Sequence, residues 1–337
     1  MIRHRFALVL AASLWAGAGA SPALAQQDPA PVKLGYAKCA HCLPVALIPG
    51  LAKGVTVDAT GFNSGNDVLT ALVSKSIDVA QVTYLHYVTA LDKGFDVVAV
   101  AGEVNGGSEC LSAKGLTLAA EDWAGFKSLV ESRKGAGTPL KVAASRGNAQ
   151  DIHMRGALLK HGINPNKDIQ FVNIPNPSDH LAAMQRGEVD LVCSVEPFAS
   201  QIRLAGAANH FVLPYDQAAG KLTNLIVTRS DVIKNRRAAV QAVVDADVAL
   251  VAKLDADKSV WIDVINQKTG LSRDVAAEAL KNAEPDYRMY RAKTLAIAEM
   301  MRDLKYISRD VSKEVEANMD FSFLEAATKK TRDGLGY

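Results

Sequence analysis

The sequence predicts an α/β fold in which parallel or mixed sheets form two similar lobes. Two observations carry this prediction: an internal repeat, and the alternation of strand-like and helix-like segments within each copy of it. A third observation, the change to helical spacing after Leu213, predicts a C-terminal helical layer. With 337 residues, 49% hydrophobic and 22% charged, the chain is long enough for about two domains and is too apolar to be disordered.

The repeat consists of two stretches that align without gaps. Asp67–Ala80 matches Asp179–Val192, and each copy reads as a helix with an acidic start, a turn and a buried strand. Upstream, Pro31–Lys38 matches Pro139–Arg146 at a similar offset, and both stretches read as a strand that ends in a small residue before a cation. Two matches in the same order indicate two related halves.

Each half therefore reads strand, loop, helix, strand, helix, strand, a pattern of crossover units that implies a parallel sheet. The six expected strands are Val32–Tyr36, Val55–Ala59, Val79–Val82, Leu140–Ala144, Ile169–Asn173 and Leu191–Val195. One further strand is expected at Thr223–Thr228, followed by helices at Arg236–Asp255, Val260–Lys268, Ser272–Ala283, Ala292–Leu304 and Ser312–Ala327. Because ligands bind beyond the carboxyl ends of strands in open α/β sheets, we expect a ligand cleft between the lobes.

The first 25 residues have the pattern of a cleavable signal peptide. Arg3 and Arg5 precede the uncharged run Phe6–Ala20, and Ala23–Ala25 supplies small residues at the cleavage site. No cysteine follows this site, so we expect a mature protein that begins near Gln26, carries no lipid anchor and is free in an oxidising compartment, the periplasm. The formal charge of +2 belongs to this segment, which argues against nucleic acid as a partner.

Five stretches resemble the solute-binding proteins of ABC importers, specifically the group that binds nitrate, taurine, aliphatic sulfonates and pyrimidine precursors. They are Lys33–Tyr36, Gly61–Asp67, Leu158–Asn164, Ala183–Asp190 and Val195–Phe198. The resemblance implies a type II periplasmic binding protein fold, with residues 26–112 and 214–337 in lobe 1 and residues 113–213 in lobe 2. It also implies a monomer without catalysis or cofactor that closes on a small molecule, an anionic organosulfur or nitrogenous compound, and presents it to a membrane permease.

Two matching loops are the first candidates for ligand contact. One contains Lys38 and the other contains Ser145, Arg146 and Asn148, and both precede a predicted helix. Backbone N–H groups at helix N-termini, with Lys38 or Arg146 beside them, suit an anionic group. The alternative is that both cations are solvated loop residues. Other candidate contacts at strand ends, each of which could instead be a turn or cap residue, are Asn63, Ser64, Thr83, Tyr84, Glu109, Glu196 and Asn224.

All four cysteines are expected at strand ends that face the cleft. Cys39 and Cys42 flank His41 in the first loop, and Cys110 and Cys193 follow later strands. Three interpretations remain open. The cysteines could form disulfides, with Cys110 and Cys193 paired or packed as small apolar residues. They could, together with His41, bind a soft metal or metal complex. Finally, Cys39-x-x-Cys42 could be the redox site of a secreted thiol oxidoreductase.

Common catalytic motifs are missing from the sequence. It contains no Gly-x-Ser-x-Gly elbow, Walker loop, dinucleotide fingerprint or His-Glu-x-x-His sequence. A haem attachment motif is excluded because Leu43 stands where the histidine would follow Cys42. We therefore expect a binding protein and not an enzyme.

Overall fold

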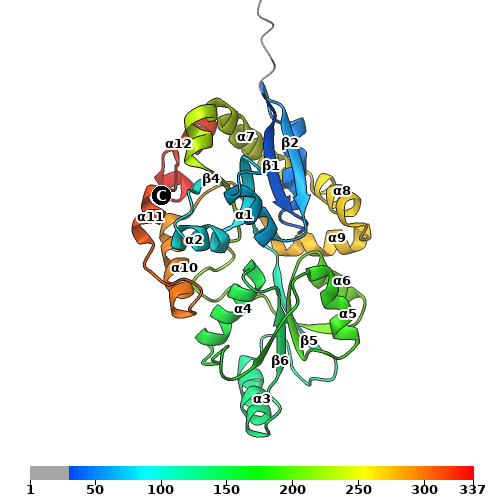
Figure 1. The fold of residues 1–337 in the computed structure, drawn as a ribbon. Helices are drawn as coiled ribbons and strands as arrows, with labels where there is room; N and C mark the ends of the chain where they lie inside the picture. Colours follow the sequence, from blue (N-terminus) through cyan, green and yellow to red (C-terminus); the bar gives the residue numbers. More distant parts are fainter. Residues whose placement is uncertain (1–29) are drawn as a thin grey trace, which may run out of the picture. The chain divides into compact units, whose positions relative to one another are not determined.

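A computed structural model describes residues 30–337. The expected signal segment, residues 1–25, lies outside the described residues. Residues 31–337 form one compact unit built around two sheets (Figure 1). No helix within the described part of the chain is long and apolar enough to cross a membrane.

The first sheet has six strands in the order β11-β4-β10-β3-β1-β2. Their bounds are β1 Val32–Ala37, β2 Val57–Phe62, β3 Val79–Thr83, β4 Val98–Gly106, β10 Asn224–Thr228 and β11 Ala283–Asp286. The β1–β2 and β1–β3 pairs are parallel, as the crossover pattern predicts, whereas β10 and β11 pair antiparallel with their neighbours. The sheet is therefore mixed.

The second sheet has five strands in the order β7-β6-β8-β5-β9. Their bounds are β5 Ser108–Ala113, β6 Lys141–Ala144, β7 Gln170–Asn173, β8 Leu191–Val195 and β9 Ala208–Val212. The strands β7, β6 and β8 run parallel, and β5 lies antiparallel to both β8 and β9. The parallel part of each sheet thus comes from one copy of the repeat.

Short helices follow the strands in each half. In the first half these are η1 Leu43–Gly50, α1 Gly65–Val73 and α2 Tyr84–Asp92; in the second they are α3 Trp123–Gly135, α4 Ala149–Lys160, η2 Pro177–Asp179, α5 His180–Gln185 and α6 Phe198–Leu204. The remaining helices are α7 Ser230–Ala256, α8 Lys258–Thr269, α9 Arg273–Ala279, η3 Leu280–Asn282, α10 Arg291–Asp303, α11 Ser312–Ala317, α12 Ser322–Thr328 and η4 Asp333–Leu335.

The helix expected over Ser312–Ala327 is two helices in the structure, α11 and α12. Between them Met319 forms a parallel bridge with Ala99 of β4, and two backbone hydrogen bonds at Ala99 join the same segment to the strand. A continuous helix would use these N–H and C=O groups internally, so the edge pairing with β4 interrupts it.

The chain passes from the first sheet to the second at Gly106–Gly107. Both residues have positive φ, 92° and 86°, which favours glycine. Space also requires glycine, because a Cβ would lie 2.5 Å from the Asn282 carbonyl oxygen at Gly106 and 2.0 Å from His41 Nδ1 at Gly107. The chain returns between β9 and β10, so β5 belongs to the second sheet and β10 to the first.

Apolar side chains pack into one large core and two smaller ones. The large core joins the first sheet to the C-terminal helices and includes the fully buried Trp261 and Phe321. The smaller cores lie at the second sheet; Phe126 and Phe211 pack in one, and Ala199 and Ile202 in the other. The C-terminal helices therefore extend the core of the first sheet, as the helical-layer prediction required.

Candidate functional site

A cavity lies where strands from both sheets end. Its walls come from the loop after β1, the end of β3, the first turns of α1, α2 and α4, and the end of β8. The lining residues are Ala37, Lys38, Cys39, His41, Cys42, Asn63, Ser64, Gly65, Gln81, Val82, Thr83, His86, Asn148, Ala149, Gln150, Pro177 and Val195. It offers ≈ 40 Å³ to the centre of a water-sized molecule, which is room for a few non-hydrogen atoms.

Three helix N-termini converge on this cavity. Ser64 caps α1 and Thr83 caps α2, each accepting a hydrogen bond from a first-turn N–H group. Asn148 stands at the N-cap of α4 but makes no side-chain cap. The first-turn N–H groups of a helix have no intrahelical acceptor, and the helix dipole adds positive potential there. The helix ends therefore add positive potential to the cavity wall, beside the charge of Lys38.

A chain of hydrogen bonds joins the two halves beside the cavity. His86 Nδ1 lies 2.9 Å from Thr83 Oγ1, and His86 Nε2 lies 3.1 Å from Asn66 Oδ1. The Asn66 amide in turn donates to the backbone carbonyl of Arg146, which follows β6 in the other sheet. Burial lowers the pKa of His86 to about 4, so its imidazole is neutral near pH 7. This chain positions α1, α2 and the β6 loop around the cavity.

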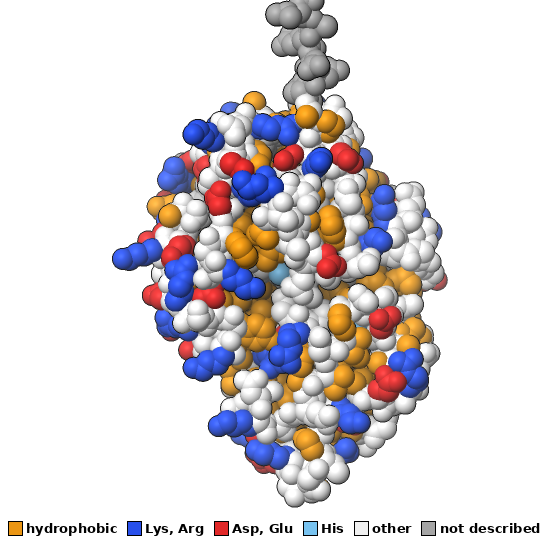
Figure 2. Space-filling view, viewed as in Figure 1, with side chains coloured by type: hydrophobic (Ala, Val, Ile, Leu, Met, Phe, Trp, Pro, Cys, Tyr) orange, Lys and Arg blue, Asp and Glu red, His pale blue; other side chains and the backbone are white. Residues whose placement is uncertain are grey.

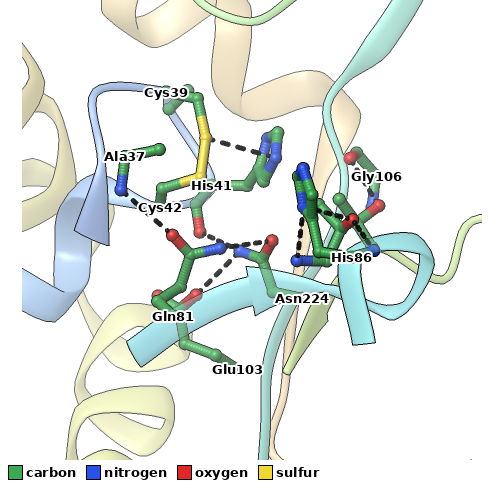
Figure 3. Close-up of a disulfide and its surroundings, with 12 residues drawn as sticks. Ala37, Cys39, His41, Cys42, Gln81, His86, Glu103, Gly106 and Asn224 are labelled. Atoms are coloured by element: carbon green, nitrogen blue, oxygen red, sulfur yellow. Dashed lines mark hydrogen bonds between the residues drawn. A yellow bond between two sulfur atoms is a disulfide. The ribbon is translucent and has the colours of Figure 1, made fainter. Parts of the chain in front are cut away.

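The loop that contains Cys39, His41 and Cys42 is held by three hydrogen bonds from distant segments. Ala40 N–H donates to the Glu196 carbonyl at 2.7 Å, and Trp261 Nε1 donates to the Ala40 carbonyl at 2.7 Å. Asn224 Nδ2 donates to the His41 carbonyl at 2.6 Å (Figure 3). Cys39 and Cys42 form a disulfide within this loop.

His41 lies under the loop and is 1% exposed. Its Nε2 lies 3.3 Å from Cys39 Sγ (Figure 3), and its Nδ1 has no hydrogen-bond partner among residues 30–337. Burial, with a smaller contribution from His153, lowers the pKa of His41 to about 3. The ring is therefore neutral and one nitrogen lone pair is available.

Behind the loop lies a buried polar network. Gln81 accepts from Ala37 N–H and donates to Asn224 Oδ1, and Asn224 Nδ2 also donates to Glu103 Oε2 at 2.8 Å. Burial raises the pKa of Glu103 well above its usual range, and the nearby Asp247 raises it further. Neither carboxyl oxygen of Asp247 has a hydrogen-bond partner within the described residues, and burial raises its pKa as well. Burial therefore favours the protonated, neutral form of both acids.

The structure brings eight of the candidate residues to this cavity. They are Lys38, Cys39, His41, Cys42, Asn63, Ser64, Thr83 and Asn148. The other eight do not line it: Tyr84, Glu109, Cys110, Ser145, Arg146, Cys193, Glu196 and Asn224.

Arg146 points away from the cavity. Its guanidinium lies 4.7 Å from the centre of the Phe171 ring on the surface, and only its backbone carbonyl faces α1. Ser145 Oγ lies 2.9 Å from the carbonyls of Ile174 and Pro175, and Tyr84 is fully buried in the large core. Of the two expected loop cations, Lys38 alone lines the cavity. The matching position of Lys38 and Arg146 in the two repeats does not determine where a long, exposed arginine side chain points.

The expectation that all four cysteines face the cleft does not hold for Cys110 and Cys193. These residues are directly opposite each other in the antiparallel β5–β8 pair and form a disulfide. Both are buried in a hydrophobic core of the second sheet. The sequence placed them after strands, but both lie inside strands, where the pleat turns their side chains into the core.

Glu109 and Glu196 belong to a charged cluster elsewhere between the same strands. Glu109 accepts hydrogen bonds from Arg203 Nε and from His210 Nδ1, at 3.1 Å and 2.7 Å. Burial, and then the charge of Glu109, raises the pKa of Glu196 to about 8. Arg203 also pairs with Glu278 of the segment after β10. This cluster joins the two halves but does not reach the cavity.

Sequence reasoning missed Gln81, His86 and Gln150. A glutamine inside the otherwise apolar strand β3 was a detectable signal, because a buried polar side chain needs a partner. The spacing Thr83-x-x-His86 was another, since it resembles a capping box in which the third helical residue returns a hydrogen bond to the cap.

A groove continues outward from the cavity. It shares Lys38, Asn63 and Pro177 with it and adds Phe198 and Lys268. Its volume, ≈ 310 Å³ on the same measure, is much larger than that of the cavity. Figure 2 shows a hollow at mid-height on the viewed face, with hydrophobic side chains in it and Lys and Arg side chains around it.

Known proteins resemble this chain in sequence. A model of the NMT1-like family matches residues 25–261. Over 78 residues, 23% of this chain and 17% of the relative, the sequence is 36% identical to the nitrate/nitrite binding protein NrtA of Synechococcus elongatus. The match thus spans less than a fifth of that protein's length.

Solved structures share the fold over most of the chain. The nitrate-binding protein NrtA of Synechocystis matches with a TM-score of 0.77 and 16% identity, covering 88% of each chain. The aliphatic sulphonate binding protein SsuA of Escherichia coli matches with a TM-score of 0.69 and 20% identity, covering 87% of this chain and 92% of that one. A zinc-bound ligand-binding component of an ABC-type import system from Staphylococcus aureus matches at 0.74 and 16% identity, covering 89% and 99%. The fold is that of α/β periplasmic binding proteins.

Proposed function

The chain belongs to the NMT1-like family, and from this premise we propose that it is a solute-binding protein that delivers a small molecule to an ABC importer. The two sheets are the centres of two lobes, and the cavity where their strands end is the ligand site. The nitrate- and sulphonate-binding proteins that share the fold support this function. Hinge motion at Gly106–Gly107 and at the β9–β10 return would open the site.

The ligand that fits is a compact anion. The convergence of three helix N-termini on one small cavity carries this proposal, because N–H groups and helix dipoles there favour negative charge. Lys38 at the edge adds a full positive charge. His41 and His86 are neutral near pH 7, so they serve as hydrogen-bonding groups and not as counter-ions.

The inner cavity and the outer groove differ in volume, so they suit different parts of the ligand. The inner cavity takes a small oxyanion such as a nitrogen oxide or the head of a sulfonate. The outer groove, with Phe198 and Lys268, has room for a short organic substituent. An anionic organosulfur or nitrogenous compound satisfies both.

The cellular setting follows the family. We propose export by the N-terminal segment, periplasmic residence as a monomer and docking to a permease, without catalysis. The disulfides Cys39–Cys42 and Cys110–Cys193 support an oxidising compartment and leave no free thiol nucleophile within residues 30–337.

Isothermal titration with nitrate, nitrite, taurine, methanesulfonate and uracil tests the ligand class. We expect saturable 1:1 binding of one or more of the anions and none of uracil. Replacement of Lys38 by Met should weaken anion binding by roughly 1–2 kcal/mol, about 5- to 30-fold, because it removes a charge-assisted contact at an exposed position.

Lys53→Met is the matched control, since Lys53 is an exposed lysine outside the cavity. It should bind the anion as the unmodified protein does. Binding of neutral uracil, or equal anion affinities in the two variants, would overturn the anion site.

A further inference from the structure

We propose that a dithiol opens the Cys39–Cys42 disulfide and that the two thiolates, together with His41 Nε2, then bind a soft metal cation such as Cu(I) or Zn²⁺. The site is the wall of the cavity described above, and it differs from anion binding in its redox state and in the charge of its occupant. Only the competition between the two occupants rests on the proposed function.

The three donor atoms already lie close together. Cys39 Sγ, Cys42 Sγ and a ring nitrogen of His41 fall within 4.8 Å of one another, and His41 Nε2 is 3.3 Å from Cys39 Sγ. A tetrahedral metal with bonds of about 2.0–2.3 Å holds its donors roughly 3.5–4 Å apart. Opening the sulfur–sulfur bond moves the two sulfurs toward this spacing, so no rearrangement of the loop is needed.

The histidine offers a nitrogen donor beside the sulfurs. His41 is buried, and its Nε2 lies 3.3 Å from Cys39 Sγ. Within the described residues Nε2 has no hydrogen-bond partner other than this sulfur, so a metal recruits it without breaking a strong hydrogen bond. Thiolate and imidazole donors together select Cu(I) and Zn²⁺ over Mg²⁺ or Ca²⁺.

The loop keeps its shape without the disulfide. Hydrogen bonds from Ala40 N–H to the Glu196 carbonyl and from Trp261 to the Ala40 carbonyl hold it at two points. A third runs from Asn224 to the His41 carbonyl (Figure 3). None of them involves a sulfur atom. Cys42 also stands at the N-cap of η1, where the helix dipole stabilises a thiolate. The reduced loop is thus preorganised for a metal.

The redox step balances with a dithiol as the electron donor. One thiolate of the dithiol attacks a sulfur of Cys39–Cys42, and its second thiol resolves the mixed disulfide. Two electrons and two protons pass to the cysteines, and the donor leaves as its cyclic disulfide. Metal binding then releases the two thiol protons.

The two occupants exclude each other. Both occupants would use the wall of the same small cavity, so they compete for it. The oxidised protein would present neutral sulfurs and electropositive helix ends to an anion, whereas the reduced protein would present two thiolates to a cation. Redox state would therefore select the class of ligand.

Titration of reduced protein with Cu(I), in competition with a chromophoric chelator, tests the site after dithiothreitol has been removed under anaerobic conditions. We expect one Cu(I) per protein with sulfur-to-copper absorption in the ultraviolet, and at least 100-fold weaker binding by the oxidised protein. A parallel titration with Zn²⁺ measures the protons that metal binding releases. Equal binding by oxidised and reduced protein would refute the proposal.

Two variants identify the donors. Cys39→Ser/Cys42→Ser should lose the absorption band, and His41→Asn should keep both thiols yet bind at least 10-fold more weakly. Cys110→Ser/Cys193→Ser is the matched control and should retain Cu(I) binding, with circular dichroism confirming that each variant is folded. Unchanged affinity in folded His41→Asn would refute the three-donor site. Anion titration of the oxidised protein is read separately, so failure of one proposal leaves the other testable.

Discussion

The buried carboxyl of Glu196 makes the stability of the protein depend on pH. Its side chain is 1% exposed, accepts a hydrogen bond from Ser200 N–H, and has a pKa raised from 4.5 to about 8, first by burial and then by the charge of Glu109. In the unfolded chain the same group loses its proton near pH 4.5. The folded state therefore binds more protons between these pH values, and its free energy of unfolding falls as pH rises through this window.

The size of the effect follows from the pKa. Each tenfold change in proton affinity is worth ~1.4 kcal/mol, so a rise to about 8 sets a ceiling of ~5 kcal/mol between pH 4.5 and pH 8. Local rearrangement lowers this, and we expect roughly 2–5 kcal/mol. Glu196→Gln cannot ionise, yet its carbonyl oxygen can still accept from Ser200. The variant should match the unmodified protein at pH 5 and exceed it in stability at pH 8.

Urea unfolding followed by circular dichroism at pH 5, 6.5 and 8 measures this difference. Burial raises the pKa values of Glu103 and Asp247 in both proteins, so the contributions of these two groups to the pH dependence cancel in the comparison. Glu131→Gln, on an exposed part of α3, is the control and should leave the slope unchanged. Parallel profiles for Glu196→Gln and the unmodified protein, or a less stable variant at pH 8, would refute the reasoning.

Three further outcomes are expected. Gly65→Ala should abolish anion binding, because its Cβ would lie 2.4 Å from His86 Cε1 in the cavity wall; titration of the folded variant checks this, and retained affinity would contradict it. Trp261→Phe should lose ~1–3 kcal/mol of stability in urea unfolding, since it leaves the loop carbonyl that its Nε1 bonds at 2.7 Å without a donor; an unchanged midpoint would mean that the bond contributes nothing. Removing both Cys110 and Cys193, which are separated by 83 residues, should lower the free energy of unfolding by ~2–5 kcal/mol. Thermal or urea unfolding measures this, and a smaller loss would show that the disulfide adds little to strand pairing.

The fold was predictable because its signals are local or repeated. Six strands and their crossovers follow from apolar runs and from the two matching halves, and the structure shows strands at all six places. The antiparallel strand β5 was not predicted, because Glu109, Cys110 and Ser112 give it a mixed pattern that resembles a loop. Its pairing with β8 depends on residues 79 to 87 positions away, which no local pattern encodes.

The candidate site was predictable in part. Loops after strands identified Lys38, Cys39 and Asn63 because position along the strand decides which end of the sheet they reach. Arg146 failed this reasoning, since a flexible side chain takes the direction that its neighbours allow, here toward Phe171. His86 lies three residues into a helix, and its place in the cavity wall depends on the closure of Asn66 onto the Arg146 carbonyl.

The three hydrogen bonds that hold the Cys39–Cys42 loop also affect the order in which the molecule folds. Glu196, Asn224 and Trp261 follow the loop by 156, 183 and 221 positions in the chain. Contacts of such separation form late, because the intervening chain must first be ordered. A chain synthesised from its N-terminus would thus remain without a shaped cavity until its helical part has docked. Acquisition of ligand affinity would then report the completion of folding, and not merely the formation of the first sheet.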